Sequence, residues 1–310
     1  MGGNLDNEWA PGQRQGGAPA ASGMVAKLRL TLEMIKFEHS VFALPFALTG
    51  ALLARRGLPT WRELFWIVVA MVGARSAAMT FNRIADFRLD ALNPRTRTRA
   101  LPTGQLSLGF AIVLTAVSCA LLVLAAYELN PLAFKLSPVA IVILLGYSFA
   151  KRFTVLSHLI LGLCLGMSPP AAWIALRGDL SVSVLLLGAA VTLWVGGFDI
   201  IYACQDVEFD HALGLHSIPR RYGVRAALYT SAALHVVMLA LLIVVLRMEH
   251  LGWTAAAGLV AVAALLAHEH ALVKPSNLSR VNAAFFTVNG FISLLFFVTW
   301  GADIVLHAAG

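Results

Sequence analysis

Asn82, Asp86 and Asp90 lie four residues apart at the end of a long apolar segment. A helix turns about 100° per residue, so the three side chains fall within an arc of roughly 80° on one face. Amide and carboxylate oxygens that converge without His or Cys suit a hard cation such as Mg²⁺, which takes phosphate oxygens among its remaining ligands. The stretch therefore predicts a site that binds a divalent cation and a phosphate group together.

Five arginines within seventeen residues accompany this acidic ladder. They are Arg83, Arg88, Arg95, Arg97 and Arg99. Guanidinium groups bind phosphate oxygens through forked hydrogen bonds, and Arg75, seven residues before Asn82, falls on the same helix face. A basic loop that only sets membrane topology accounts for the arginines equally well, but it does not account for the regular spacing of the aspartates.

A second acidic cluster repeats the first. Asp199, Asp206 and Asp210 fall within about 40° of one another on a helical wheel. Asp206 and Asp210 follow Asp86 and Asp90 by 120 residues in each case. We interpret this offset as an internal repeat that places the two clusters face to face. Helix capping or loop solvation, the simpler alternative, requires only one residue at each helix end.

The composition defines the class of protein. At 310 residues, with 59% hydrophobic and only 13% charged residues, the chain has the composition of a polytopic helical membrane protein and excludes a soluble one. The net charge of +7 resides in short loops between apolar segments. Positive-inside topology explains this charge more simply than binding to nucleic acid does.

Nine apolar segments are each about 17 to 25 residues long, enough to cross a hydrocarbon core of roughly 30 Å as a helix. They are residues 37–54, 64–81, 106–127, 132–149, 155–176, 180–204, 226–246, 253–273 and 283–306. Pro169 and Pro170 are expected to break the fifth segment. Residues 1–26, rich in Gly, Ala, Pro and Gln, are predicted to be a disordered cytoplasmic tail, and residues 27–310 a single transmembrane domain.

The distribution of Lys and Arg predicts the orientation. With the N-terminus in the cytoplasm, sixteen of these residues fall on the inner side and six on the outer side. Both acidic clusters then lie at the cytoplasmic face of a plasma membrane. The expected fold is an all-α membrane domain of nine transmembrane helices. Two four-helix repeats plus one further helix surround a central cleft that opens to the cytoplasmic side.

Two opposed carboxylate clusters suit a pair of Mg²⁺ ions that bridge a diphosphate and neutralise the charge it gains as a leaving group. A lipid tail attached to that diphosphate fits an apolar cleft between helices. The predicted chemistry is ionisation of an allylic diphosphate in a site that excludes water, where aromatic rings stabilise the cation. His158 is interpreted as a hydrogen-bonded polar residue inside the membrane, with a role in an acceptor pocket as the alternative.

At this point the sequence resembles a known family, the UbiA-type membrane prenyltransferases. Their signature is an N-x-x-x-D-x-x-x-D loop and a second D-x-x-x-D loop, and both are present in order. The segment from Tyr147 to Lys151 matches a family Y-x-x-x-K element, and Arg75 matches a family Arg seven residues before the motif Asn. The resemblance covers nearly the whole chain after the tail. The sequence also looks like a bacterial subgroup of 4-hydroxybenzoate polyprenyltransferase-like proteins.

The resemblance implies roles for individual residues. The residues that hold Mg²⁺ and diphosphate and form the catalytic set would be Asn82, Asp86, Asp90, Asp206 and Asp210. The substrate-binding residues would be Arg75, Arg88, Arg97, Tyr147, Lys151, Asp199 and Tyr202. Within that set Arg88, Arg97 and Lys151 would contact phosphate, and Arg75 would orient the acceptor through a carboxylate.

The sequence departs from the family pattern at two places. Arg83 stands where many members have Asp, and the stretch from Gly214 to His216 lacks the Lys residues that flank the corresponding Gly in many members. Both departures bear on the identity of the acceptor.

The expected function is Mg²⁺-dependent transfer of a polyprenyl group from its diphosphate to a ring carbon of an aromatic acid, 4-hydroxybenzoate or a naphthoate, in ubiquinone or menaquinone biosynthesis. The expected location is a bacterial inner membrane, and the expected partners are the two substrates and the lipid bilayer. Prenyl transfer in haem O synthesis or to homogentisate is the alternative within the family. A repeat-built transporter with a central ion site is the alternative outside it, and it predicts acidic residues near the bilayer midplane.

Overall fold

The computed structural model describes residues 23–36 and 42–308, and this part of the chain is almost entirely helical. The predicted disordered tail, residues 1–26, lies outside the described residues except for its last four, where α1 already begins. The helices are α1 (Met24–Met34), α2 (Leu44–Arg55), α3 (Trp61–Ala85), α4 (Phe87–Leu92), α5 (Leu108–Leu129), α6 (Pro131–Ala150), α7 (Ser157–Gly166), α8 (Ser168–Arg177), α9 (Val182–Ala203), α10 (Val207–Ala212), α11 (Ile218–Met248), α12 (Trp253–Leu272) and α13 (Asn289–Ala308).

Eight helical stretches in the described part of the chain are long and apolar enough to cross a membrane. They coincide with the second to ninth predicted segments, so an all-helical, multi-span membrane fold is confirmed. The first predicted segment, residues 37–54, corresponds to α2, which has only 12 residues and a length of about 18 Å. Residues 37–41 lie outside the described residues.

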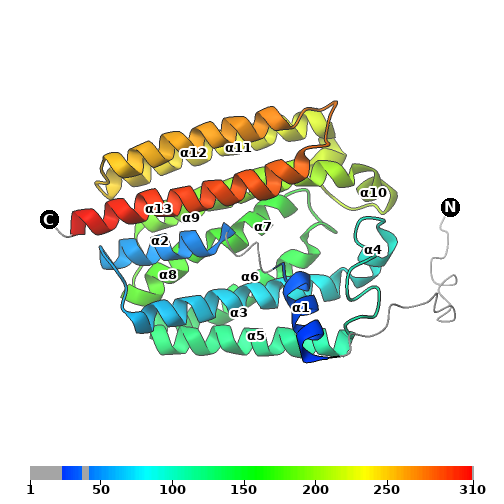
Figure 1. The fold of residues 1–310 in the computed structure, drawn as a ribbon, viewed down its shortest axis with the longest axis horizontal. Coiled ribbons are helices and arrows are strands. Elements are labelled where there is room, and N and C mark those ends of the chain that lie inside the picture. Colours follow the sequence, from blue (N-terminus) through cyan, green and yellow to red (C-terminus); the bar gives the residue numbers. More distant parts are fainter. Residues whose placement is uncertain (1–22, 37–41, 309–310) are drawn as a thin grey trace.

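The helices form a bundle whose two sides are built from different parts of the chain (Figure 1). Helices α3, α5 and α6 lie along one side, and α9, α11, α12 and α13 along the other. The short helices α4 and α10 lie at the same end of the bundle. This end carries Asp86, Asp90, Asp206 and Asp210, which therefore do not lie at mid-depth in the bundle.

The two end helices share a local geometry. Helices α4 and α10 have six residues each and are offset by 120 positions. Each follows an Asp at its N-cap with nearly the same backbone dihedrals, φ −94° and ψ 8° for Asp86 and φ −104° and ψ 9° for Asp206. The predicted continuous helix through Asn82, Asp86 and Asp90 is interrupted at Asp86. The i to i+4 spacing survives, because Asp90 N donates to Asp86 O at 2.7 Å.

The fifth predicted segment is broken as expected. Helix α7 ends at Gly166, and α8 begins at Ser168 with Pro169 and Pro170 in its first turn, where a missing N–H costs no helical hydrogen bond. Helix α7 approaches α9 so closely that a Cβ at Gly162 would collide with the backbone oxygen of Thr192. Glycine allows these two helices to pack backbone against backbone.

Two consecutive buried hydrogen bonds join helices α9, α12 and α13. Trp194 Nε1 donates to Asn289 Oδ1 at 2.8 Å, and Asn289 Nδ2 donates to Glu269 Oε1 at 2.6 Å. All three side chains have 0% relative exposure, so the hydrogen bonds repay part of the cost of burying them. The chain fixes the Trp194 indole at the centre of the bundle.

The close approach of α7 and α9 gives a testable consequence. Gly162→Ala should lower stability by about 1–3 kcal/mol, because the added methyl forces the two backbones apart. Gly146→Ala on α6 is the matched control, since no atom of the described residues lies within 4 Å of a Cβ there, and it should leave stability unchanged or raise it by up to about 1 kcal/mol. Thermal unfolding in detergent measures both, and equal melting temperatures for the two variants would contradict this packing.

Candidate active site

A cavity of about 840 Å³ opens at the end of the bundle that carries α4 and α10. Ten of the twelve site residues predicted from the sequence line it. They are Arg75, Asn82, Asp86, Asp90, Tyr147, Lys151, Asp199, Tyr202, Asp206 and Asp210. Residues more than a hundred positions apart in the chain thus share one chamber.

Arg88 and Arg97, the other two predicted residues, do not line this cavity. Arg88 lines a separate pocket of about 660 Å³, and Arg97 is exposed. Arg83, Arg95 and Arg99 line the main cavity instead. The segment after α4 forms consecutive turns without helical periodicity, so spacing in the sequence does not reveal which of its arginines point inward.

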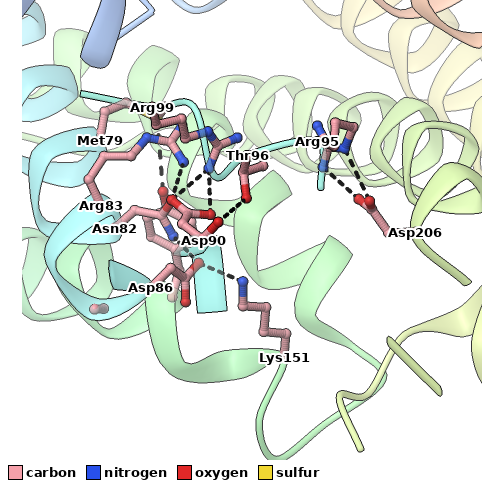
Figure 2. A network of polar contacts seen from close by, with 12 residues as sticks. Met79, Asn82, Arg83, Asp86, Asp90, Arg95, Thr96, Arg99, Lys151 and Asp206 are labelled. Atoms are coloured by element: carbon pink, nitrogen blue, oxygen red, sulfur yellow. Dashed lines mark hydrogen bonds and ion pairs between the residues drawn. The ribbon is translucent and has the colours of Figure 1, made fainter. Parts of the chain in front are cut away.

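Asp86 is held from two directions. Its carboxylate is 4% exposed and lies 2.5 Å from Lys151 Nζ and 3.5 Å from Arg152 Nη2, both just beyond the end of α6. Asn82 Nδ2 lies 3.4 Å from Asp86 Oδ2. Asn82 and Asp86 are therefore adjacent in space at the end of α3. Lys151, the last residue of the Tyr147–Lys151 element, binds the Asp86 carboxylate (Figure 2).

Asp90 forms the most heavily charged contact in the cavity. Arg99 Nη1 donates to both of its carboxylate oxygens, at 2.7 and 2.8 Å, and Arg83 Nη1 lies 3.6 Å away (Figure 2). Thr96 Oγ1 donates to the backbone oxygen of Asp90 at 3.0 Å. These contacts fold the segment after α4 back onto the helix. The buried Arg83, a departure from the family pattern, thereby gains a structural partner.

Arg95 connects the two acidic clusters. From the segment after α4 it donates Nε and Nη2 to the two carboxylate oxygens of Asp206, at 3.1 and 2.7 Å, and Nη1 to Tyr202 Oη at 2.9 Å. Burial disfavours its charge, but the Asp206 carboxylate outweighs this effect and raises the pKa of the guanidinium. Figure 2 shows this pair beside the Asp86 and Asp90 contacts.

The other two carboxylates have weaker partners. Asp210 Oδ2 accepts a hydrogen bond from Ser217 Oγ at 2.7 Å, and Asp199 Oδ2 lies 2.7 Å from His158 Nδ1. His158, previously interpreted as a hydrogen-bonded residue inside the membrane, lines the cavity together with Asp199.

The donor set fits Mg²⁺. In the cavity, carboxylate and amide oxygens are accompanied by Lys and Arg, which is the chemistry of a cation that is shared with a phosphate ligand. Within residues 23–36 and 42–308, no three acidic, His or Cys side chains already surround one point. A cation that takes one or two protein carboxylates and completes its shell with water and phosphate matches this arrangement.

Aromatic rings also line the cavity, in addition to the charged side chains described above, which we call the rim: Asp86, Asp90, Arg95, Arg99, Lys151, Asp206 and Asp210. Phe42, Phe198 and Phe285 pack against one another with centroids 5.1 to 6.0 Å apart, and Tyr202 lies 4.3 Å from Phe285. Phe42 lies two residues before α2, Phe198 and Tyr202 lie in α9, and Phe285 lies in the π-helical segment Ala283–Val288 before α13. The sequence contained no spacing signal for them, because packing alone brings them together.

Fold and site together define a multi-span helical membrane enzyme with a charged cavity rim and an aromatic interior. The model of the UbiA prenyltransferase family matches residues 43–295, and the chain belongs to this family. It is a membrane prenyltransferase.

Two comparisons show how similar its relatives are. A 4-hydroxybenzoate octaprenyltransferase from Vibrio cholerae is 35% identical over 254 residues, which cover 80% of this chain and 88% of the relative. The apo structure of a UbiA homolog from Aeropyrum pernix K1 is 38% identical and superposes with a TM-score of 0.78, covering 87% of this chain and 98% of that one.

A more distant structure shares the fold. A UbiA homolog from Archaeoglobus fulgidus, bound to DMAPP and Mg²⁺, is 19% identical and has a TM-score of 0.70 over 89% of this chain and 99% of its own.

Arg95 lines the cavity and pairs with Asp206, whereas Arg97 does not line it, so the two residues test whether phosphate binding depends on position in the cavity. Arg95→Met should weaken binding of a prenyl diphosphate by about 10-fold or more, because a charge-assisted hydrogen bond contributes about 1.5–3 kcal/mol. Arg97→Met removes the same charge from a residue that does not line the cavity and should change binding by less than about twofold. The KM for geranyl diphosphate at saturating Mg²⁺ measures both effects. An equal rise in KM in the two variants would mean that phosphate binding depends on the overall positive charge and not on the position of Arg95.

Proposed function

We propose that the protein transfers a polyprenyl group from a polyprenyl diphosphate to a ring carbon of a small aromatic acid, 4-hydroxybenzoate or a naphthoate, in ubiquinone or menaquinone biosynthesis. The observation that carries the proposal is the single cavity in which two acidic clusters and several basic side chains meet an aromatic wall. The names of the curated relatives support 4-hydroxybenzoate as the acceptor class.

The rim of the cavity binds the diphosphate. Asn82, Asp86 and Asp90 on one side and Asp206 and Asp210 on the other would hold one or two Mg²⁺ ions, which supply charge neutralisation to the leaving diphosphate. Lys151, Arg95 and Arg99 are each paired with one of these aspartates, and their cationic groups would bind phosphate oxygens directly.

The interior of the cavity controls the fate of the allylic cation. Phe198, Tyr202 and Phe285 line the cavity, and their aromatic rings would stabilise positive charge at the carbon that leaves the diphosphate. The same rings exclude water, which would otherwise capture the cation as an alcohol. The ring carbon of the acceptor then bonds to that carbon and loses its proton.

Arg75 is placed to orient the acceptor. It projects from α3 into the cavity seven residues before Asn82, and its Nη2 donates to the backbone oxygen of Lys36 at 3.1 Å. A guanidinium at this depth is suited to the carboxylate of an aromatic acid. An acceptor without a carboxylate, as in haem O synthesis, lacks this contact.

The location follows from the same reasoning. The multi-pass fold places the protein in a membrane, and its curated relatives are bacterial. We place it in a bacterial inner membrane with the N-terminus and the open end of the cavity facing the cytoplasm, in agreement with the excess of Lys and Arg at that end.

The test is diphosphate release by purified protein in detergent, with geranyl diphosphate and Mg²⁺. The acceptors to compare are 4-hydroxybenzoate, 1,4-dihydroxy-2-naphthoate, 1,4-dihydroxy-6-naphthoate and homogentisate. Release that requires one aromatic acid and stops with EDTA is the expected result. Release only with homogentisate would move the protein to the alternative within the family, and release without any acceptor would contradict ring transfer.

The acidic clusters make a further prediction. Asp86→Asn and Asp206→Asn should each lower turnover by about 100-fold or more. Each replaces a negatively charged carboxylate, proposed to bind Mg²⁺ beside the leaving diphosphate, with a neutral amide. Asp179→Asn is the control, since that exposed carboxylate binds only Trp173 and Arg177 outside the cavity. Turnover of all three variants within twofold of the unmodified protein would remove the role assigned to the clusters.

A further inference from the structure

The cavity contains a carboxylate–imidazole pair to which the proposed diphosphate site gives no role. His158, at the start of α7, is 4% exposed, and its Nδ1 lies 2.7 Å from Oδ2 of Asp199 on α9. Both residues line the cavity. Cations already engage three of the other aspartates in the cavity, whereas among residues 23–36 and 42–308 the side-chain partner of Asp199 is the imidazole of His158.

The hydrogen bonds of His158 fix its tautomer. The backbone N–H of Ile218, the first residue of α11, points at His158 Nε2 at 3.5 Å. A backbone N–H only donates, so Nε2 is an acceptor and the ring proton of neutral His158 resides on Nδ1. His158 therefore donates to Asp199, and the carboxylate is held in one orientation as a proton acceptor.

Asp199 lies deeper in the bundle than the carboxylates at the rim. It precedes Asp206 by seven residues, which is roughly 10 Å along a helix axis. Arg75 also lines the cavity, and it precedes Asp86, the counterpart of Asp206, by eleven residues. It therefore lies four residues, or roughly 6 Å along a helix axis, deeper than Asp199. An aromatic acid whose carboxylate binds Arg75 would extend its ring from there toward the level of Asp199, below the departing diphosphate.

We propose that Asp199 is the general base that removes the ring proton of the acceptor, and that His158 positions it. This inference rests on the proposed function. The C1–O bond to diphosphate breaks first, and the ring carbon then donates an electron pair to C1. The ring C–H bond breaks last: its electrons restore the aromatic ring and its proton goes to the Asp199 carboxylate. No oxidant or reductant is required, and the diphosphate carries away the negative charge.

The main experiment compares full-length Asp199→Asn with the unmodified protein. The acceptor is the aromatic acid that supports diphosphate release, with and without deuterium at the carbon that is prenylated. Loss of a general base should lower formation of the prenylated ring by about 100-fold or more. It should also raise the primary deuterium isotope effect on kcat above that of the unmodified protein, because proton loss becomes the slow step. Asp179→Asn is the matched control and should show neither change.

Two substitutions of His158 separate positioning from packing. A Gln side chain offers an amide N–H to Asp199 and a carbonyl oxygen to Ile218, so His158→Gln should retain most of kcat with an unchanged isotope effect. His158→Leu offers neither and should lower kcat by about 10-fold while raising the isotope effect. The KM for the acceptor should change little in both variants.

The outcomes distinguish this inference from the proposed function. If the unmodified protein releases no diphosphate with any aromatic acid, the proposed function fails and this inference fails with it. If the unmodified protein is active, and Asp199→Asn stays within about threefold of it with an unchanged isotope effect, only this inference fails. Equal activity of His158→Leu and His158→Gln would remove the positioning role. If diphosphate release and ring prenylation both fall in Asp199→Asn, and the isotope effect on the residual kcat is unchanged, Asp199 would belong to the diphosphate site instead.

Discussion

Carboxylates next to hydrocarbon must be neutralised, and this requirement shapes the open end of the bundle. Asp86 and Asp206 lie just beyond the long apolar helices α3 and α9, and Asp90 is buried within the short helix α4. An unpaired charge is costly at such positions. Each is paired with Lys or Arg from a different segment. The pairs of Arg95 with Asp206 and of Arg99 with Asp90 hold the segment after α4 against α4 and against the N-cap of α10. They also keep the acids and bases that a diphosphate requires within reach of one another.

The cavity separates two chemical requirements by depth. Ionisation needs charged ligands and room for phosphate, and the end of the cavity beside α4 and α10 provides these. Carbon–carbon bond formation needs a dry, electron-rich surface, and the aromatic wall below the rim provides that. The Trp194–Asn289–Glu269 chain supports this division, because it fixes the indole against which Phe42 and Phe198 pack. Packing far from the rim thus determines the shape of the reacting chamber.

Much of this arrangement could be predicted from the sequence, where local periodicity or composition carried the signal. The apolar segments gave the helices, and the four-residue spacing of Asn82, Asp86 and Asp90 placed them in one cavity. The same reasoning gave no means to choose Arg95 over Arg97, since turns lack a fixed period. It also missed the partnership of His158 with Asp199, because helices α7 and α9 meet only through tertiary packing. The aromatic wall was hidden for the same reason, and the short α2 shows that an apolar stretch alone does not fix helix length.

The 120-residue offset has a consequence for symmetry. Counting forward by that offset, Arg83, Arg95 and Arg99 correspond to Ala203, Leu215 and Pro219, so the two halves match in their aspartates but not in their bases. A twofold-symmetric cradle would bind either end of a diphosphate equally well. The substrate has one phosphate esterified to a hydrocarbon chain and one that is free, and an uneven cradle distinguishes them. The unequal divergence of two similar halves thereby gives the bound substrate a single polarity.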